Sequence, residues 1–127
     1  MIEIKNVSKT YNGKKKALAD NNISFTAMEG EVLGILGPNG AGKTTTIKSI
    51  VGILDFEEGD ILINGKSIKK SPIECKKQMA YVPDNPDLYE NMKAIDFINF
   101  ICDMYEVSKE VREENINKYA KMFEMQE

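Results

Sequence analysis

One segment of eight residues limits what this chain can fold into more than any other. Residues 37–44 read GPNGAGKT and satisfy the pattern G-x-x-x-x-G-K-[ST] at every fixed position. The apolar run before it, residues 32–36, predicts a strand buried on both faces of a parallel sheet. After it, apolar residues recur at helical spacing, at Ile47, Ile50, Val51 and Leu54. The sequence therefore predicts strand, glycine loop and helix in succession, as in an α/β protein.

The chemistry of this segment suits a polyphosphate. Its glycines permit backbone conformations with positive φ, and the N-terminus of the following helix favours anions. Lys43 can reach the β- and γ-phosphates, where it would act in catalysis, and the Thr44 hydroxyl is placed to bind Mg²⁺. The residues expected to contact the nucleotide here are Gly37, Pro38, Asn39, Gly40, Ala41, Gly42, Lys43, Thr44 and Thr45.

Composition narrows the class of protein. The chain has 127 residues, enough for one domain at most, with 42% hydrophobic and 29% charged residues, as in ordinary soluble globular proteins. A net charge of −3 gives no electrostatic reason to expect nucleic acid or an anionic membrane surface as a partner. No apolar run approaches the ~20 residues that span a bilayer, and the first residues do not form a signal peptide. Cys75 and Cys102 are expected to be free thiols in a reducing cytoplasm.

The segments before the glycine loop predict an antiparallel hairpin. A half-buried strand runs from Ile2 to about Thr10, a turn follows at residues 11–13, and a returning strand covers residues 18–27. The lysines at 14–16 are interpreted as a solvated hairpin tip rather than a phosphate clamp. Residues 28–31 are expected to turn the chain into the buried strand at 32–36.

Beyond the loop helix, residues 55–60 form a polar loop, and Ile61–Ile63 form a strand that ends in an Asn64-Gly65 turn. A capping box of Ser71, Pro72 and Glu74 predicts a short helix. A second core strand is expected over residues 79–82. Asp55 resembles a metal-binding acid at the end of an apolar run. We reject that interpretation because the run belongs to the loop helix and not to a separate strand.

The last third of the sequence is helical. Residues 93–106 carry apolar side chains on two faces, which indicates a helix packed inside a larger domain or against a partner. Ser108 is expected to cap a second helix, whose apolar stripe is Val111, Ile116, Tyr119 and Phe123.

These segments together resemble the N-terminal half of the ATP-binding domain of ABC transporters. The loop GPNGAGKTT is close to that family's own version of the motif, and residues 61–65 (ILING) match its following strand and turn. Tyr11 falls where the family places an aromatic ring that stacks on adenine, although a strand-end aromatic is the alternative. Residues 81–92 (YVPDNPDLYENM) resemble the segment that contacts the membrane subunit. Asp84 stands where the family usually has a Mg²⁺-contacting glutamine, and its alternative is an ordinary loop acid.

The resemblance implies a P-loop NTPase core with an antiparallel β subdomain in residues 1–84 and the start of a helical subdomain in residues 85–127. It implies ATP and Mg²⁺ as cofactors, with ATP hydrolysis coupled to transport. An acid at position 84 resembles the branch of the family that includes exporters. Its implied partners are a membrane-spanning subunit, contacted through residues 84–105, and a second ATP-binding domain. The implied location is the cytoplasmic face of the cell membrane.

The family's signature LSGGQ, second metal-holding acid, catalytic glutamate and switch histidine have no counterpart in this sequence, so this chain alone is expected to be inactive. A soluble ABC-type ATPase and a non-catalytic nucleotide-binding module stay open as alternatives. A GTPase is not expected, because the only similar segment, residues 117–120, lacks the final aspartate of [NT]-K-x-D.

Overall fold

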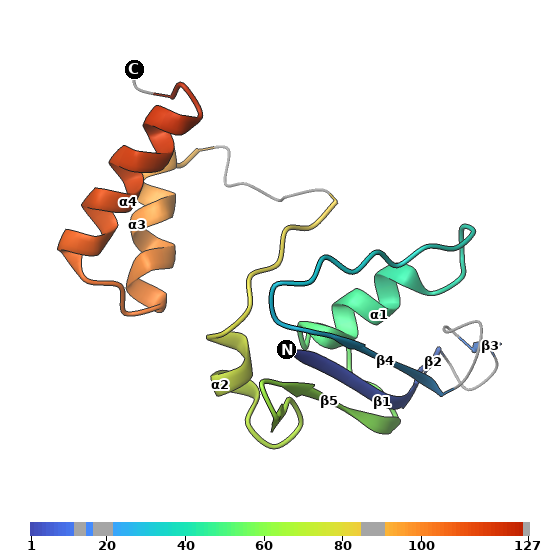
Figure 1. Cartoon of the computed structure of the whole chain (residues 1–127). Helices are drawn as coiled ribbons and strands as arrows, with labels where there is room; N and C mark the ends of the chain where they lie inside the picture. Colours follow the sequence, from blue (N-terminus) through green and yellow to red (C-terminus); the bar gives the residue numbers. More distant parts are fainter. Residues whose placement is uncertain (12–14, 17–21, 85–90, 126–127) are drawn as a thin grey trace. The chain divides into compact units, whose positions relative to one another are not determined.

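The computed structural model describes residues 1–11, 15–16, 22–84 and 91–125, which fall into two compact units (Figure 1). The first unit is Met1–Tyr81 and the second is Val82–Glu127. The first contains a sheet and the helices α1 and α2, and the second contains the helices α3 and α4.

A four-stranded antiparallel sheet forms the base of the first unit. Its strand order is β4-β1-β5-β6, with β1 at Ile2–Ser8, β4 at Ile23–Ala27, β5 at Glu58–Ile63 and β6 at Lys66–Ser67. Ile4 of β1 lies opposite Phe25 of β4 on one side and Ile61 of β5 on the other. The pairing of β1 with β4 confirms the predicted antiparallel hairpin, and β5 begins three residues earlier than the expected strand.

A short ribbon of β2 (Thr10–Tyr11) and β3 (Lys15–Lys16) follows β1. Thr10 pairs with Lys16, and Tyr11 pairs with Lys15. Most of the expected turn and the start of the returning strand lie outside the described residues. So does Lys14, the first residue of the expected lysine tip.

The Asn64-Gly65 turn is present as predicted. It joins β5 to β6 with two residues at positive φ, 48° for Asn64 and 79° for Gly65. This is the backbone geometry of a two-residue hairpin loop, which the Asn-Gly pair adopts with little strain.

The core of the first unit lies between the sheet and α1, which spans Lys43–Ile50. Ile4, Val7, Ile61 and Ile63 of the sheet pack with Ile50 of the helix. The predicted apolar stripe is only partly correct, since Ile47 is 38% exposed and the buried face of α1 includes Thr46 and Ser49. The helix is also shorter than the pattern suggested.

The end of α1 is fixed by Gly52. Gly52 has a φ of 67°, and its N–H donates to the carbonyl of Ser49. The N–H of Ile53 donates to the carbonyl of Lys48. These two bonds form the helix-terminating arrangement that favours glycine at the left-handed position.

The prediction of core strands at residues 32–36 and 79–82 is wrong, because neither segment forms a strand. Residues 32–36 run in an irregular extended trace from the sheet toward α1, and residues 79–82 also lack strand pairing (Figure 1). Val32 is 99% exposed, Leu36 94% and Val82 87%. A strand requires a neighbour that accepts its backbone hydrogen bonds. Among the described residues no strand pairs with either segment, so their apolar composition alone does not produce a sheet.

The short helix α2 forms at Pro72–Lys76, but the predicted capping box does not. The Ser71 side chain makes no capping hydrogen bond. The Glu74 carboxylate instead forms an ion pair with Lys66 of β6, so it is directed away from the backbone N–H of Ser71. The helix therefore begins with Pro72 at its first turn and without the side-chain cap.

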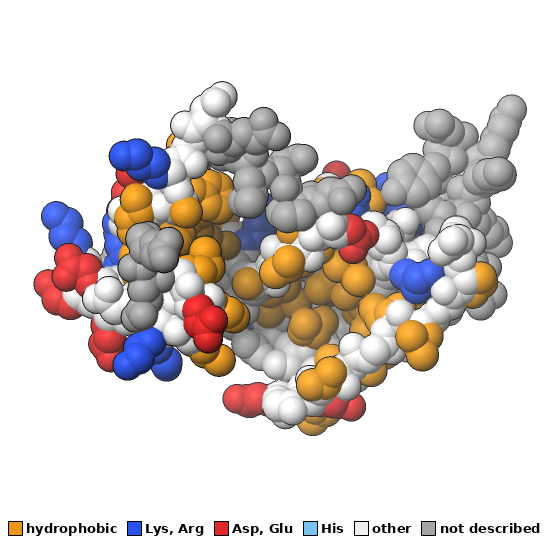
Figure 2. Space-filling view, turned by 90° about the horizontal axis from the view of Figure 1, so that it is seen from above, with side chains coloured by type: hydrophobic (Ala, Val, Ile, Leu, Met, Phe, Trp, Pro, Cys, Tyr) orange, Lys and Arg blue, Asp and Glu red, His pale blue; other side chains and the backbone are white. Residues whose placement is uncertain are grey.

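The second unit is a pair of helices, α3 (Ala94–Met104) and α4 (Lys109–Met122). Ser108 caps α4 as predicted, accepting a hydrogen bond from the N–H of Val111 at 3.4 Å. Neither helix contains a fully buried residue. Hydrophobic side chains are exposed on both units (Figure 2). On the two helices and the turn after α3 they are Ile95, Ile98, Phe100, Ile101, Met104, Tyr105, Val111, Tyr119 and Met122.

Candidate nucleotide-binding site

The glycine loop leads directly into α1, as its sequence pattern predicted. Gly42 is the residue before the helix and has φ 92°, while Gly40 has φ 81°. A Cβ at Gly37 would lie 3.2 Å from the Cβ of Ala41, closer than ordinary packing distance. All three glycines are therefore needed for this loop, two for their positive φ and one for a close approach.

The Lys43 side chain bonds back to the start of the glycine loop. Its Nζ donates to the carbonyl oxygens of Gly37, at 2.7 Å, and of Pro38, at 2.8 Å. The ammonium group therefore lies at the centre of the loop that begins six residues earlier. A positive charge held there, beside the N-terminus of α1, creates a site that favours an anion.

The first turn of α1 also favours an anion. It contains no acidic side chain. Thr44 is exposed, which leaves its hydroxyl open to a ligand or metal. Thr46 is buried instead, with its hydroxyl donating to the carbonyl of Gly42 at 3.0 Å. The two threonines thus have different environments, and Thr46 helps to hold the loop while Thr44 faces outward.

Tyr11 lies in β2, and its side chain is outside the described part of the structure. The backbone just before it is held by Glu57. The Glu57 carboxylate accepts a hydrogen bond from the Thr10 N–H at 2.9 Å and another from Lys9 Nζ at 3.2 Å. Sequence reasoning placed Glu57 in a polar loop and missed this contact, because nothing local in the sequence links residues 47 positions apart.

Asp84 is exposed, in a bend of the second unit. The structure does not bring it together with Thr44 within one unit, so its role at a metal remains a proposal. Within the described residues, no three His, Cys, Asp or Glu side chains are grouped so that they could hold a metal ion.

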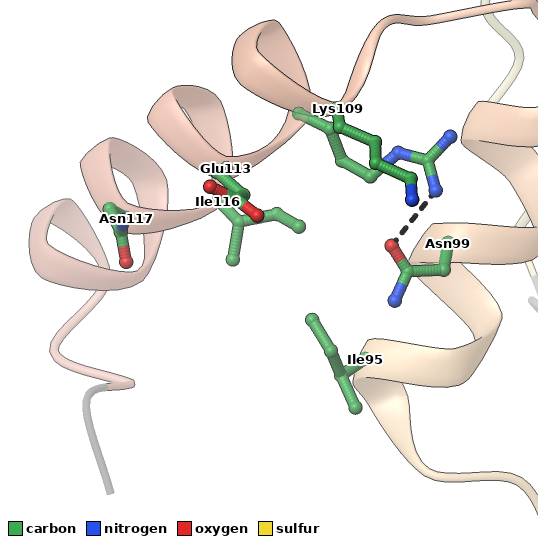
Figure 3. A pocket seen from close by; sticks show the side chains of 7 residues that line it. Ile95, Asn99, Lys109, Glu113, Ile116 and Asn117 are labelled. Atoms are coloured by element: carbon green, nitrogen blue, oxygen red, sulfur yellow. Dashed lines mark hydrogen bonds between the residues drawn. The ribbon is translucent and has the colours of Figure 1, made fainter.

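Two pockets lie away from the glycine loop. One, of about 440 Å³, lies between α3 and α4, where Ile95 and Asn99 face Glu113, Ile116 and Asn117 (Figure 3). The dashed line in Figure 3 marks a hydrogen bond from Arg112 to Asn99. The other, of about 350 Å³, lies at the end of α1 and includes Asp55. Neither contains a residue of the glycine loop, and we assign neither a role in nucleotide binding.

A glycine loop that opens a helix beside an antiparallel sheet, with a lysine at its centre, defines a phosphate-binding protein of the α/β class. The model of the ABC transporter family matches residues 21–127. This chain therefore belongs to the ABC transporter ATP-binding family.

Individual proteins agree with this assignment. The ABC-type transporter ATP-binding protein EcsA of Bacillus subtilis is 36% identical over 105 residues, which are 83% of this chain and 42% of EcsA. The solved structure of an ATP-binding subunit of an ABC transporter has a TM-score of 0.89 at 30% identity, and the match covers 99% of this chain and 51% of that one. The dimeric structure of MJ0796, a bacterial ABC transporter cassette, has a TM-score of 0.78 at 27% identity, covering 98% and 57%.

The chain spans about half the length of these relatives. The match to solved structures confirms the predicted ABC cassette fold, although only part of that fold is present here. In the part of the chain that the structure describes, no helix combines the length and apolar character needed to cross a membrane.

Proposed function

We propose that this chain is the N-terminal part of the ATP-binding subunit of an ABC transporter, which couples Mg²⁺-ATP binding and hydrolysis to transport. The observation that carries the proposal is the glycine loop with Lys43 Nζ bound at its centre, in a chain of this family. In this proposal residues 1–84 form the nucleotide-binding core and β subdomain, and residues 85–127 begin the helical subdomain.

Each site residue has a proposed role. The backbone N–H groups of residues 39–45 and the Lys43 ammonium bind the phosphates, and Lys43 stabilises charge that develops during hydrolysis. Thr44 binds Mg²⁺, for which its exposed side chain is suitably placed. Asp84 contacts the same Mg²⁺, and the Tyr11 ring stacks on adenine.

Hydrolysis of ATP by such a site depends on positioning and on charge stabilisation rather than on a covalent intermediate. The family's signature segment, second metal-holding acid and catalytic glutamate are not found in these 127 residues. We therefore propose that the chain binds nucleotide but does not hydrolyse it by itself.

Two partners follow from this proposal. One is a second ATP-binding domain, in keeping with the dimeric structure of the related cassette MJ0796. The other is a membrane-spanning subunit, contacted through residues 84–105. Exposed apolar residues in this range, such as Ile95 and Phe100 of α3, support a protein contact there. The subunit would then lie on the cytoplasmic face of the membrane, and export is one direction of transport that the proposal allows.

The test is co-purification followed by ATPase measurement with the full-length protein. We expect a membrane-spanning subunit to co-purify from detergent extracts, and Mg²⁺-dependent ATPase activity that Lys43→Ala abolishes. Activity without any membrane partner would indicate a soluble ABC-type ATPase. Nucleotide binding without turnover in the full-length protein would indicate a non-catalytic module.

A further inference from the structure

Glu57 joins three consecutive residues at the point where the chain leaves the main sheet. Its own N–H donates to the carbonyl of Ser8 at 3.1 Å, while its carboxylate accepts from Lys9 Nζ and from the N–H of Thr10. The Lys9 side chain is only 15% exposed and that of Glu57 is 47% exposed, so the ion pair is shielded from solvent on its lysine side. Glu57 thus holds the backbone of Ser8 through its own N–H and the backbone of Thr10 through its carboxylate, at the end of β1 and the start of β2.

The ribbon that begins at Thr10 is short. Its two strands, β2 and β3, contain two residues each and form a sheet separate from the four-stranded one. An isolated two-stranded ribbon is marginally stable in water. A charge-assisted hydrogen bond to the backbone N–H of Thr10 is stronger than a neutral one and has a defined direction. It therefore holds the backbone of the residue that directly precedes Tyr11.

We propose that Glu57 is a positioning residue for the nucleotide base, which orients Tyr11 by holding the backbone of Thr10. This inference rests on the proposed function, in which the Tyr11 ring stacks on adenine. Glu57 itself does not touch the nucleotide in this proposal. Its effect should therefore appear in the part of the affinity that depends on the base and not in the part that depends on the phosphates.

The experiment separates these two parts with two ligands, ATP and inorganic tripolyphosphate, titrated calorimetrically into the full-length protein. The variants are Glu57→Ala, which removes the acceptor, and Glu57→Gln, which retains an oxygen that can accept from the Thr10 N–H. Glu58→Ala is the matched control, because it removes the same charge at the next position, whose carboxylate does not make the bonds to Lys9 and Thr10 described above.

We expect Glu57→Ala to weaken ATP binding about tenfold, within the range of losses found when an aromatic stacking partner is removed, with less than a twofold change for tripolyphosphate. Glu57→Gln should recover most of the ATP affinity, and Glu58→Ala should resemble the wild type. In a Tyr11→Ala background, Glu57→Ala should cause no further loss of ATP affinity.

Three results would overturn the proposal. Equal weakening of ATP and tripolyphosphate would show that Glu57 supports the phosphate loop or overall folding. An unchanged ATP affinity in Glu57→Ala would show that Tyr11 is positioned without it, while the proposed function would stand. A wild-type protein that binds tripolyphosphate as tightly as ATP would show that no base stacking occurs, which would contradict the role of Tyr11 as well.

Discussion

Arg112 of α4 and Asp103 of α3 form the bond that ties the two helices of the second unit, with Nη2 lying 2.6 Å from Oδ1. The guanidinium also donates to Asn99 Oδ1 at 3.1 Å and to the carbonyl of Val107 at 3.2 Å. Its side chain is 12% exposed. Arg112 therefore joins α3, the turn after it and α4 through one planar group.

Replacing Arg112 should loosen this helix pair. Arg112→Ala is expected to lower the free energy of unfolding by roughly 2 kcal/mol, because three hydrogen bonds from a charged donor are lost. Arg112→Lys should not restore stability, since an ammonium group lacks the planar fork that reaches all three acceptors. Urea denaturation measures both, with Lys109→Ala on the same helix as the control. A change no larger than that of the control would contradict this role.

The glycine loop should bind anions. Phosphate, ADP and ATP are expected to raise the melting temperature, with a stabilisation of ~2.7 kcal/mol at a hundredfold excess over Kd. Lys43→Ala should reduce this effect strongly, because it removes the ammonium at the centre of the loop. Differential scanning fluorimetry across a ligand series gives the measurement. Melting temperatures that do not respond to millimolar ligand would show that the loop is not a phosphate site.

Asp84→Asn should change how activity depends on Mg²⁺. If Asp84 contacts the metal, its loss is expected to lower Mg²⁺-ATP turnover, while nucleotide binding without Mg²⁺ stays equal or becomes slightly tighter. The reason is that a carboxylate near a triphosphate is tolerated only with a cation between them. The measurement is ATPase rate against Mg²⁺ concentration in the full-length protein. Superimposable curves for wild type and variant would leave Asp84 as a loop acid.

Glu57 should make stability depend on pH in the acid range. Slight desolvation raises the pKa of the exposed carboxyl, but hydrogen bonds from the Thr10 N–H and from Lys9 outweigh this, so the pKa lies below its usual value of 4.5. A lowered pKa means that the stabilisation is present above about pH 4.5 and is lost as the pH falls through the lower, folded-state value. Urea midpoints for the wild type and for Glu57→Gln should therefore converge in acid. A constant difference down to pH 2 would be inconsistent with this assignment.

Replacing Gly59 of β5 by any other residue should strongly destabilise the protein. Its φ is 83°, and a Cβ there would lie 2.3 Å from the carbonyl oxygen of Lys5 and 2.4 Å from that of Asn6. Gly59→Ala is expected to cost roughly 3 kcal/mol or more, because backbone atoms must move.

Gly65→Ala is the matched control for Gly59→Ala. Gly65 also has a positive φ, but a Cβ there would meet no atom within 4 Å. Its replacement should cost only about 1 kcal/mol, the price of the left-handed conformation. Similar losses in the two variants would show that the close approach at Gly59 relaxes readily.

The features that could be predicted from the sequence are those fixed by residues close together in the chain. The Asn64-Gly65 turn, the Ser108 cap and the start of α1 at Lys43 each depend on a few neighbouring positions. The glycine loop belongs to the same group, since its pattern carries both the backbone geometry and the charge. These local signals also carried the family resemblance, which the comparisons confirm.

The features that could not be predicted depend on distant partners. Residues 32–36 have the composition of a buried strand, but a strand forms only where another strand accepts its hydrogen bonds. Glu74 has the position of a capping residue, yet its carboxylate binds Lys66 on the neighbouring hairpin. Glu57 appeared as a loop acid until the fold brought it to Thr10. In each case a contact between separate segments decided the outcome.

The exposed extended segment at residues 32–36 has a consequence for the synthesis of the protein. Val32 and Leu36 present apolar side chains on a backbone that pairs with no strand among the described residues. A ribosome adds about 5–20 residues per second, so a pairing strand encoded far downstream of this segment would emerge seconds later. Throughout that interval the nascent chain would offer this segment to chaperones and to neighbouring nascent chains. Translation speed downstream of this segment would then influence the yield of folded protein.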